Sequence, residues 1–284
     1  TDMEHHSNII PWQMICKKTG AKIKYLKSSS DGTIDVDKFK NALDKNIKMV
    51  SITHASNVFG TINPVKEFVN LAHKNGSKIM LDGCQAIPHM KVSVEELGCD
   101  FYAFSGHKML GPTGVGVLYG KEELLDKMEP YQTGGGIIKT VTMENSSWTS
   151  IPHKFEPGTP MIAQVIALSP AADYLENCLE SHDNKLMEYA IEKMNSINGI
   201  SIYGDAKDRT PILSFNIEGV HSLDLAHFLD FEGITIRSGH HCCQPLMQAL
   251  DISACARASF YFYNTIGEVD FLVEKINRAI KVIK

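Results

Sequence analysis

Short apolar runs alternate with helical patterns through the first half of the chain. The runs typical of strands lie at 21–26, 48–53, 78–82, 100–105 and 114–120. A helix opened by Asp35 is predicted over 34–43, and a second helix follows Asn63 and Pro64, a cap residue and a first-turn proline. Strands that alternate with helices of this length indicate βαβ units, so we predict an α/β fold with a mainly parallel sheet flanked by helices.

Two further helical segments have clear sequence signals. The apolar positions of the helix after Pro64 share one face: Val65, Phe68, Val69 and Ala72. In the segment 92–98, Ser93 and Glu96 form a capping-box pattern and Gly98 is a stop signal.

The second half of the chain has a different pattern. Residues 130–162 are rich in Gly, Thr, Ser and Pro and predict an irregular or hairpin-like excursion. A helix is expected over 163–180, where Pro170 should kink it or start a second one. Strands are predicted at 211–217 and 233–237, followed by a final helix with apolar residues at helical spacing: Val269, Leu272, Val273, Ile276, Ile280 and Ile283. We therefore predict a large domain over 1–165 and a smaller α+β domain over 166–284.

Composition narrows the class of protein. The 284 residues are 43% hydrophobic and 21% charged, with a net charge of −5 and no long basic run, which disfavours nucleic acid or an anionic membrane as a partner. No apolar stretch approaches the roughly 18 residues of a membrane-spanning helix. The polar start TDMEHHSN resembles no signal peptide, and its abruptness leads us to expect that an N-terminal segment is absent. The seven cysteines contain no C-x-x-C pair, and an odd count fits a reducing cytosol or organelle stroma better than a disulfide framework.

Four polar residues follow predicted strands: Asn57, Asp82, Gln85 and Lys108. Alone, an Asp at a strand end is more often a cap and a Lys there is usually solvated. Together, at successive strand ends of one parallel sheet, they suit pyridoxal phosphate, which needs a lysine for a Schiff base and a carboxylate for its pyridinium nitrogen. Ser105 and His107 could donate hydrogen bonds to its phosphate, and Gln85 could reach its phenolic oxygen.

The run RSGHHCC (237–243) allows a zinc site, a nucleophilic thiol or a crowded turn. Adjacent side chains point in different directions and no second spaced pair exists, so zinc is disfavoured and no metal is expected. Arg237 and the two histidines offer the positive surroundings that favour a thiolate, which makes Cys242 the candidate nucleophile. Cys243 is either a small apolar residue or a resolving thiol.

Several motifs together resemble one family. LDGCQAIPH followed by SGHKMLGPTGVGVLYGK is similar to the cofactor segment of the class V aminotransferase family of fold-type I pyridoxal-phosphate enzymes. EHHSNIIPWQ, THASNVFGTINPV, FEPGTP, RSGHHC and ARASFYFYNT resemble the SufS-like (group II) cysteine desulfurases, in order along essentially the whole chain. The resemblance implies a large domain that binds the cofactor and a small C-terminal domain that carries the cysteine loop.

The resemblance also implies roles for residues around the cofactor. Lys108 would form the Schiff base and move protons, Asp82 would pair with the pyridinium and Gln85 with the phenolic oxygen. His5 would stack on the ring and relay protons, although alone it would be interpreted as a capping or surface histidine. The remaining implied cofactor contacts come from Ser105, His107, Asn57 and Thr159. Thr159 would reach the phosphate of a neighbouring subunit, which implies a homodimer.

On the substrate side, the resemblance implies that Asn57 and Arg257 bind the carboxylate of L-cysteine and that Arg237 lies near the substrate pocket, although arginines also form structural ion pairs. Cys242 would take the substrate sulfur as a persulfide and release L-alanine, with a SufU- or SufE-like acceptor protein next in iron–sulfur cluster assembly. A cytoplasmic or plastid-type compartment is expected.

Departures from the family leave alternatives open. Met161 stands where Asn is common, Pro170 lies in a usually regular helix, and the family's upstream segment is missing. The alternatives are a selenocysteine lyase, another fold-type I enzyme, or an inactive truncated binding protein.

Overall fold

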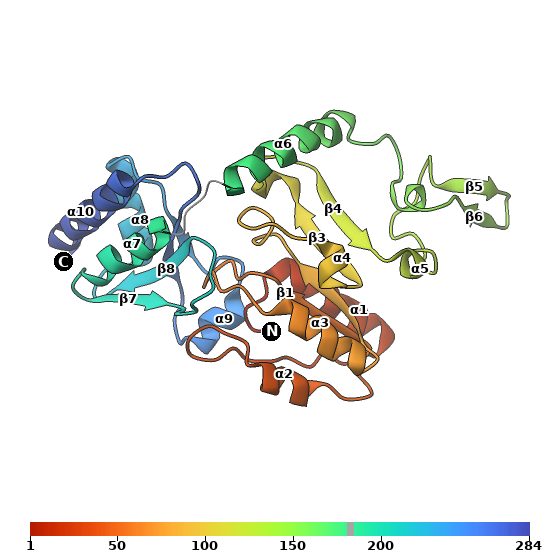
Figure 1. The fold of residues 1–284 in the computed structure, drawn as a ribbon, viewed down its shortest axis with the longest axis horizontal. Coiled ribbons are helices and arrows are strands. Elements are labelled where there is room, and N and C mark those ends of the chain that lie inside the picture. The colour runs from red at the N-terminus through yellow and green to blue at the C-terminus, as the bar shows by residue number, and fades with distance from the viewer. Residues whose placement is uncertain (181–184) are drawn as a thin grey trace.

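The first sheet is mainly parallel, as the sequence predicts. The computed structural model describes residues 1–180 and 185–284 (Figure 1). Strands β1 (Met49–Thr53), β2 (Lys78–Asp82), β3 (Phe101–Ser105) and β4 (Gly116–Gly120) lie side by side in that order. The first three run parallel and β4 runs antiparallel to β3. The predicted α/β class is confirmed, and the carboxyl ends of β1, β2 and β3 meet at one edge of the sheet.

Helices α1 (Ile10–Thr19), α2 (Val36–Ala42), α3 (Val65–Lys74) and α4 (Val94–Leu97) accompany this sheet. Asp35 caps α2 by accepting from the Lys38 amide, and Ser93 caps α4 by accepting from the Glu96 amide, both as predicted. All four apolar positions predicted for α3 are buried. The predicted cap at Asn63 is wrong, because Pro64 is the N-cap and the Asn63 side-chain amide donates instead to the Thr53 carbonyl (2.9 Å).

The strand predicted at 21–26 is not formed. Residues 21–26 have no regular secondary structure, and they line a cavity of about 830 Å³ together with residues of β1. A strand needs a neighbouring edge for its backbone hydrogen bonds. The alternating pattern here therefore lies on a segment without a sheet partner among the described residues.

A second, antiparallel sheet forms the C-terminal half. Its strands are β7 (Ile200–Tyr203), β8 (Ile212–Ile217), β10 (Cys255–Ser259) and β9 (Arg237–Gly239), in that order. Helices α7 (Lys185–Asn195), α8 (Ser222–Phe231) and α10 (Ile266–Ile283) pack with these strands around their own apolar cluster. The predicted final helix is confirmed, with Thr265 and Glu268 forming a capping box at its start. The strand predicted at 233–237 is wrong, because Ile234 and Ile236 pack on the cluster without pairing and β9 begins only at Arg237.

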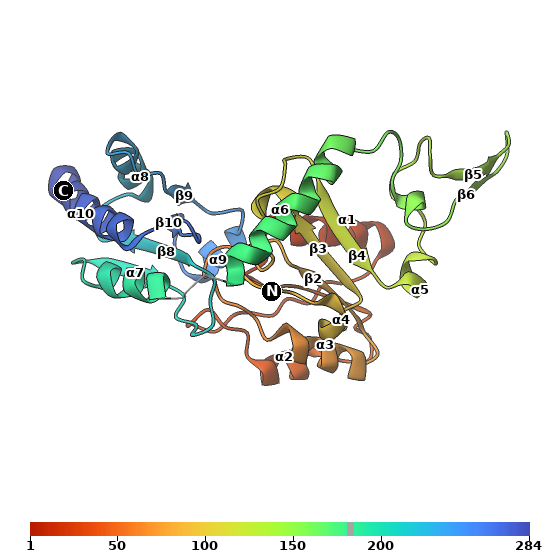
Figure 2. The same cartoon turned by 45° about the horizontal axis from the view of Figure 1, so that its top comes forward.

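The region between the two sheets contains a short helix, a hairpin and one long helix. After α5 (Glu122–Leu125), strands β5 (Ile138–Val141) and β6 (Ser146–Trp148) form the predicted hairpin, which projects from the rest of the molecule (Figures 1 and 2). Helix α6 (Ile162–Glu180) continues through Pro170, so this proline does not start a second helix. The domain boundary at 165/166 falls inside α6 and stays a prediction.

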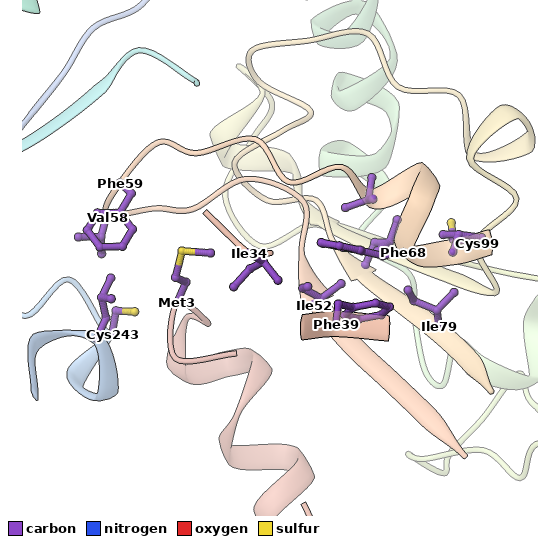
Figure 3. Packing of buried hydrophobic residues seen from close by; sticks show 14 of the residues in the cluster. Met3, Ile34, Phe39, Ile52, Val58, Phe59, Phe68, Ile79, Cys99 and Cys243 are labelled. Carbon is purple, nitrogen blue, oxygen red and sulfur yellow. The ribbon is translucent and has the colours of Figure 1, made fainter. Parts of the chain in front are cut away.

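The loop and short helix α9 (Gln244–Ala249) that follow β9 pack against the first sheet rather than the second. Cys243, Leu246 and Met247 belong to the same buried cluster as Met3 and residues of β1 and β2. Figure 3 shows Cys243 near Met3, Val58 and Phe59 at one end of this cluster. This packing brings residues 240–243 to the edge where the parallel strands end. Among the described residues, no helix has the length and apolar character that crossing a membrane requires.

Candidate active site

A cavity of about 340 Å³ lies at the carboxyl ends of the parallel strands. Every predicted site residue except Thr159 lines it: His5, Asn57, Asp82, Gln85, Ser105, His107, Lys108, Arg237, Cys242 and Arg257. Thr159 is exposed and lies outside the cavity of its own chain. The lining residues that the sequence did not single out are Ser7, Thr53, Ala55 and Cys84, and His241 of the HHCC run also lines the cavity. Thr53 could have been found by the strand-end rule, since it ends β1 opposite Asp82.

One wall of the cavity comes from strand ends. Asp82 ends β2, Ser105 ends β3, and Lys108 ends the 3₁₀ turn η2 (Gly106–Lys108). The Asp82 carboxylate accepts from the Cys84 amide (3.0 Å), and the Cys84 thiol contacts the Ser105 hydroxyl (3.6 Å). Gly83 is required between them, because a Cβ there would lie 2.0 Å from the Tyr102 ring. The wall is thus fixed by local backbone geometry and by the sheet register.

His5 lines the cavity and also caps the 3₁₀ turn η1 (His6–Asn8). Its Nδ1 accepts from the Ser7 amide (3.1 Å) and lies 2.7 Å from the Ser7 hydroxyl, so the capping role and the cavity position coexist. Burial, then the nearby Lys108 ammonium, lowers the His5 pKa. The ring is therefore neutral at pH 7 and suited to lie against another aromatic ring.

Two arginines face each other across β9 and β10. Arg257 is the register partner of Arg237 and donates through Nη1 to the Asn57 carbonyl (2.8 Å). The Arg257 Nε is buried with no hydrogen-bond partner, and among the described residues this guanidinium makes no ion pair with a carboxylate. Burial, then Arg237, lowers its pKa. An uncompensated guanidinium that lines a cavity is suited to bind a carboxylate.

The predicted nucleophile lies on a left-handed stretch of backbone. His241 and Cys242 have φ of 52° and 55°, a conformation that costs non-glycine residues about 1–2 kcal/mol each. Hydrogen bonds hold both carbonyls: Asn57 Nδ2 donates to His241 O (2.8 Å) and the His6 amide donates to Cys242 O (2.7 Å). Strain held in place by its surroundings is typical of functional sites.

The four side chains of HHCC point in different directions. Cys242 is partly exposed and lines the cavity, whereas the buried Cys243 thiol lies 3.3 Å from Glu4 O, and burial raises its pKa to about 12. His241 Nε2 contacts the Cys255 carbonyl (3.0 Å), and burial lowers the His241 pKa to about 4. His240 Nδ1 accepts from the Cys242 amide (3.1 Å). Within the described ranges, no three metal-ligating side chains gather at one point.

The lining residues fit pyridoxal phosphate. An amine, a carboxylate, hydroxyls and imidazoles line the cavity, and its volume of about 340 Å³ is within the usual range for small-molecule sites. The buried Nε of Arg257, another lining residue, has no partner, and an amino-acid carboxylate would supply its missing acceptor.

Known proteins resemble this chain over almost its full length. The family model described as aminotransferase class-V matches residues 1–272. A probable cysteine desulfurase of Halalkalibacterium halodurans is 50% identical over 98% of this chain and 70% of the relative. A cysteine desulfurase of Haloferax volcanii is 47% identical over 98% of this chain and 67% of the relative.

Solved structures show the same fold. The cysteine desulfurase CsdA of Escherichia coli superposes with a TM-score of 0.93 at 36% identity, over 100% of this chain and 71% of the other. An apo cysteine desulfurase of Thermococcus onnurineus NA1 superposes with a TM-score of 0.94 at 36% identity, over 99% of this chain and 72% of the other. The family model matches residues 1–272, and the fold superposes on solved cysteine desulfurases. The chain therefore belongs to the class-V aminotransferase family.

Proposed function

We infer that this protein is a pyridoxal-phosphate-dependent cysteine desulfurase, which converts L-cysteine to L-alanine and keeps the sulfur as a persulfide on Cys242. The observation that carries this inference is that Lys108, Asp82, Arg257 and Cys242 line one cavity. The relatives from Halalkalibacterium halodurans and Haloferax volcanii support this inference, because they are named as cysteine desulfurases and their sequences are 50% and 47% identical to this chain.

The cofactor's residues lie on the strand-end wall. Pyridoxal phosphate supplies the electron sink that weakens bonds next to the amino group of a bound amino acid. The Lys108 amine would form the covalent link to it and would carry the Cα proton, and the Asp82 carboxylate would keep its pyridine nitrogen protonated. Ser105 and His107 would hold the phosphate, Gln85 would contact the phenolic oxygen, and the His5 ring would cover the face of the cofactor.

The substrate's carboxylate binds to the Arg257 guanidinium, with Asn57 and Arg237 beside it. This places its side chain towards Cys242, whose thiolate attacks the substrate sulfur. A sulfur–sulfur bond forms as the substrate C–S bond breaks, and the electron pair of that bond stays on carbon. A proton then completes L-alanine, so covalent catalysis divides one difficult cleavage into two steps.

Further proposals concern assembly and the fate of the sulfur. Helix α6 exposes an apolar face at Ile162, Val165 and Ile166, with exposed fractions of 58%, 53% and 68%, next to the exposed Thr159. This supports a homodimer in which Thr159 reaches the partner's cofactor phosphate. A SufU- or SufE-like acceptor then takes the persulfide sulfur for iron–sulfur assembly in the cytoplasm.

The test combines turnover with mapping of the lysine. Protein given pyridoxal phosphate, L-cysteine and a thiol reductant should release alanine and sulfide in equal amounts. Borohydride reduction should then fix the cofactor's mass on the peptide with Lys108, and Lys108→Ala should lose both signals, while the exposed-site control Lys74→Ala keeps them.

Two results would contradict the inference. Preference for L-selenocysteine with no turnover of L-cysteine would favour a selenocysteine lyase. Protein that takes up no cofactor would favour a binding protein instead.

A further inference from the structure

The first residues of the chain lie directly against the nucleophile loop. Besides the bond from the His6 amide to Cys242 O (2.7 Å), the Cys243 thiol donates to Glu4 O (3.3 Å). The His6 and His240 rings lie 5.5 Å apart between centroids. The segment that carries the cavity residue His5 is therefore joined to Cys242 by contacts that span nearly the whole sequence.

The His6 side chain adds a contact at the start of α9. Amides at a helix start have no partner within the helix and need an external acceptor. Cys243 is the N-cap of α9 but its side chain makes no capping hydrogen bond. The Gln244 amide donates instead to His6 Nε2 (3.0 Å), so a histidine 238 positions earlier in the sequence serves as the acceptor.

We propose that His6 is a positioning residue for the Cys242 nucleophile. Its imidazole holds the Gln244 amide on one side of the strained pair His241–Cys242, while Asn57 holds the His241 carbonyl on the other. With both ends fixed, the left-handed backbone keeps the Cys242 thiol in the cavity. This proposal rests on the proposed function and assigns His6 no contact with substrate or cofactor.

The protonation of His6 agrees with this role. Nε2 can accept a hydrogen bond only when the ring is neutral. Burial, then the neighbouring His240, lowers the His6 pKa, so the ring is neutral at pH 7.

The test compares His6→Ala with His6→Gln and His6→Asn. The glutamine oxygen can reach the Gln244 amide, whereas the shorter asparagine cannot. His227→Ala, an exposed histidine on α8, is the matched control. Loss of one hydrogen bond should lower kcat for alanine formation about fivefold to tenfold in the Ala and Asn variants, with KM for L-cysteine and the cofactor's absorption spectrum unchanged. His6→Gln should restore kcat to within about twofold, since it restores that bond.

A second measurement does not depend on desulfurase turnover. Iodoacetamide labelling of Cys242, followed by mass spectrometry at pH 7.5 in about tenfold excess reagent, reports the thiol itself. A released loop exposes the thiol, so labelling should be faster in His6→Ala and His6→Asn and normal in His6→Gln and His227→Ala. Thermal melts show whether each variant is folded, and the Asn–Gln pair decides the result if His6→Ala does not fold.

Two outcomes would overturn the proposal. One is a labelling rate and a kcat in His6→Ala and His6→Asn that equal those of the parent protein. The other is equal loss in His6→Gln and His6→Ala, because the role would then not be that of an acceptor. If the parent protein makes no alanine, the proposed function fails, and labelling still decides whether His6 positions Cys242.

Discussion

The two sides of the cavity are built in opposite ways. Asp82 and Ser105 end neighbouring strands in regular register, and Lys108 follows within three residues. Cys242 instead lies on a left-handed backbone held by Asn57 and by the His6 amide from distant parts of the chain. One side is fixed mainly by secondary structure and the other mainly by contacts between distant parts of the chain.

The difference corresponds to what each side must do. A cofactor bound through many contacts needs a wall that does not move between turnovers. A thiol that must meet the substrate sulfur needs a support of its own, separate from the wall that would hold the cofactor. Perturbing the strand-end wall should therefore change cofactor binding, whereas perturbing the loop should change the chemistry of Cys242.

The largest expected difference in activity is between substitutions of the two adjacent cysteines. Cys242→Ala removes the proposed nucleophile and should lower alanine formation at least about 10³-fold. Cys243→Ala should keep activity within about twofold and cost about 1 kcal/mol of unfolding free energy, because Cys243 is a buried apolar residue. Assays of alanine formation measure the activity of each variant, and urea unfolding measures its stability. Loss of sulfur transfer in Cys243→Ala would instead make Cys243 a resolving thiol.

A second comparison uses two partly buried arginines. Arg257→Lys loses the donor proposed to bind the substrate carboxylate and should raise KM for L-cysteine about 10- to 100-fold. Arg209 donates to Phe59 O (3.0 Å) and Ile212 O (2.9 Å) but does not line the cavity. Arg209→Lys should therefore lower stability and leave KM unchanged, and an equal rise in KM for both variants would contradict the carboxylate role.

A smaller effect should distinguish the wall from the loop. Asn57→Ala removes the bond to the His241 carbonyl and should speed iodoacetamide labelling of Cys242 by about fivefold. Ser105→Ala should weaken binding of pyridoxal phosphate by about fivefold, measured by fluorescence titration, and leave the labelling rate unchanged. If each variant changed cofactor binding and the labelling rate of Cys242 equally, the strand-end wall and the cysteine loop would not be independent.

A last comparison concerns acid stability rather than activity. His54 lies at the end of β1, 2.9 Å from the Tyr102 hydroxyl, and burial lowers its pKa to about 4. Because the unfolded chain binds the proton near pH 6.5, stability is complete above that pH and falls towards pH 4 by up to about 1.4 kcal/mol per pH unit. Urea unfolding at pH 7 and pH 5 should show a smaller loss in His54→Gln. An unchanged loss would mean that His54 is already charged in the folded protein.

Much of the fold followed from local patterns. The face of α3, the caps Asp35 and Ser93 and the final helix are confirmed because each depends on residues within a few positions of one another. The strand predicted at 21–26 is wrong because pairing depends on a distant neighbour that periodicity does not encode. Arg237 begins β9 rather than ending a strand for the same reason.

The sequence alone determined the residue types of the candidate site, because pyridoxal phosphate requires a lysine and a carboxylate, the proposed sulfur transfer requires a thiol, and the motifs that hold these residues are short. Tertiary structure decided how they meet. Only the folded chain carries Cys242 from the second sheet to the ends of the first, buries Cys243 beside Met3, and brings His6 to the Gln244 amide. The physical reason is that these contacts depend on the packing of distant segments, whereas strand ends and caps depend on neighbours along the chain.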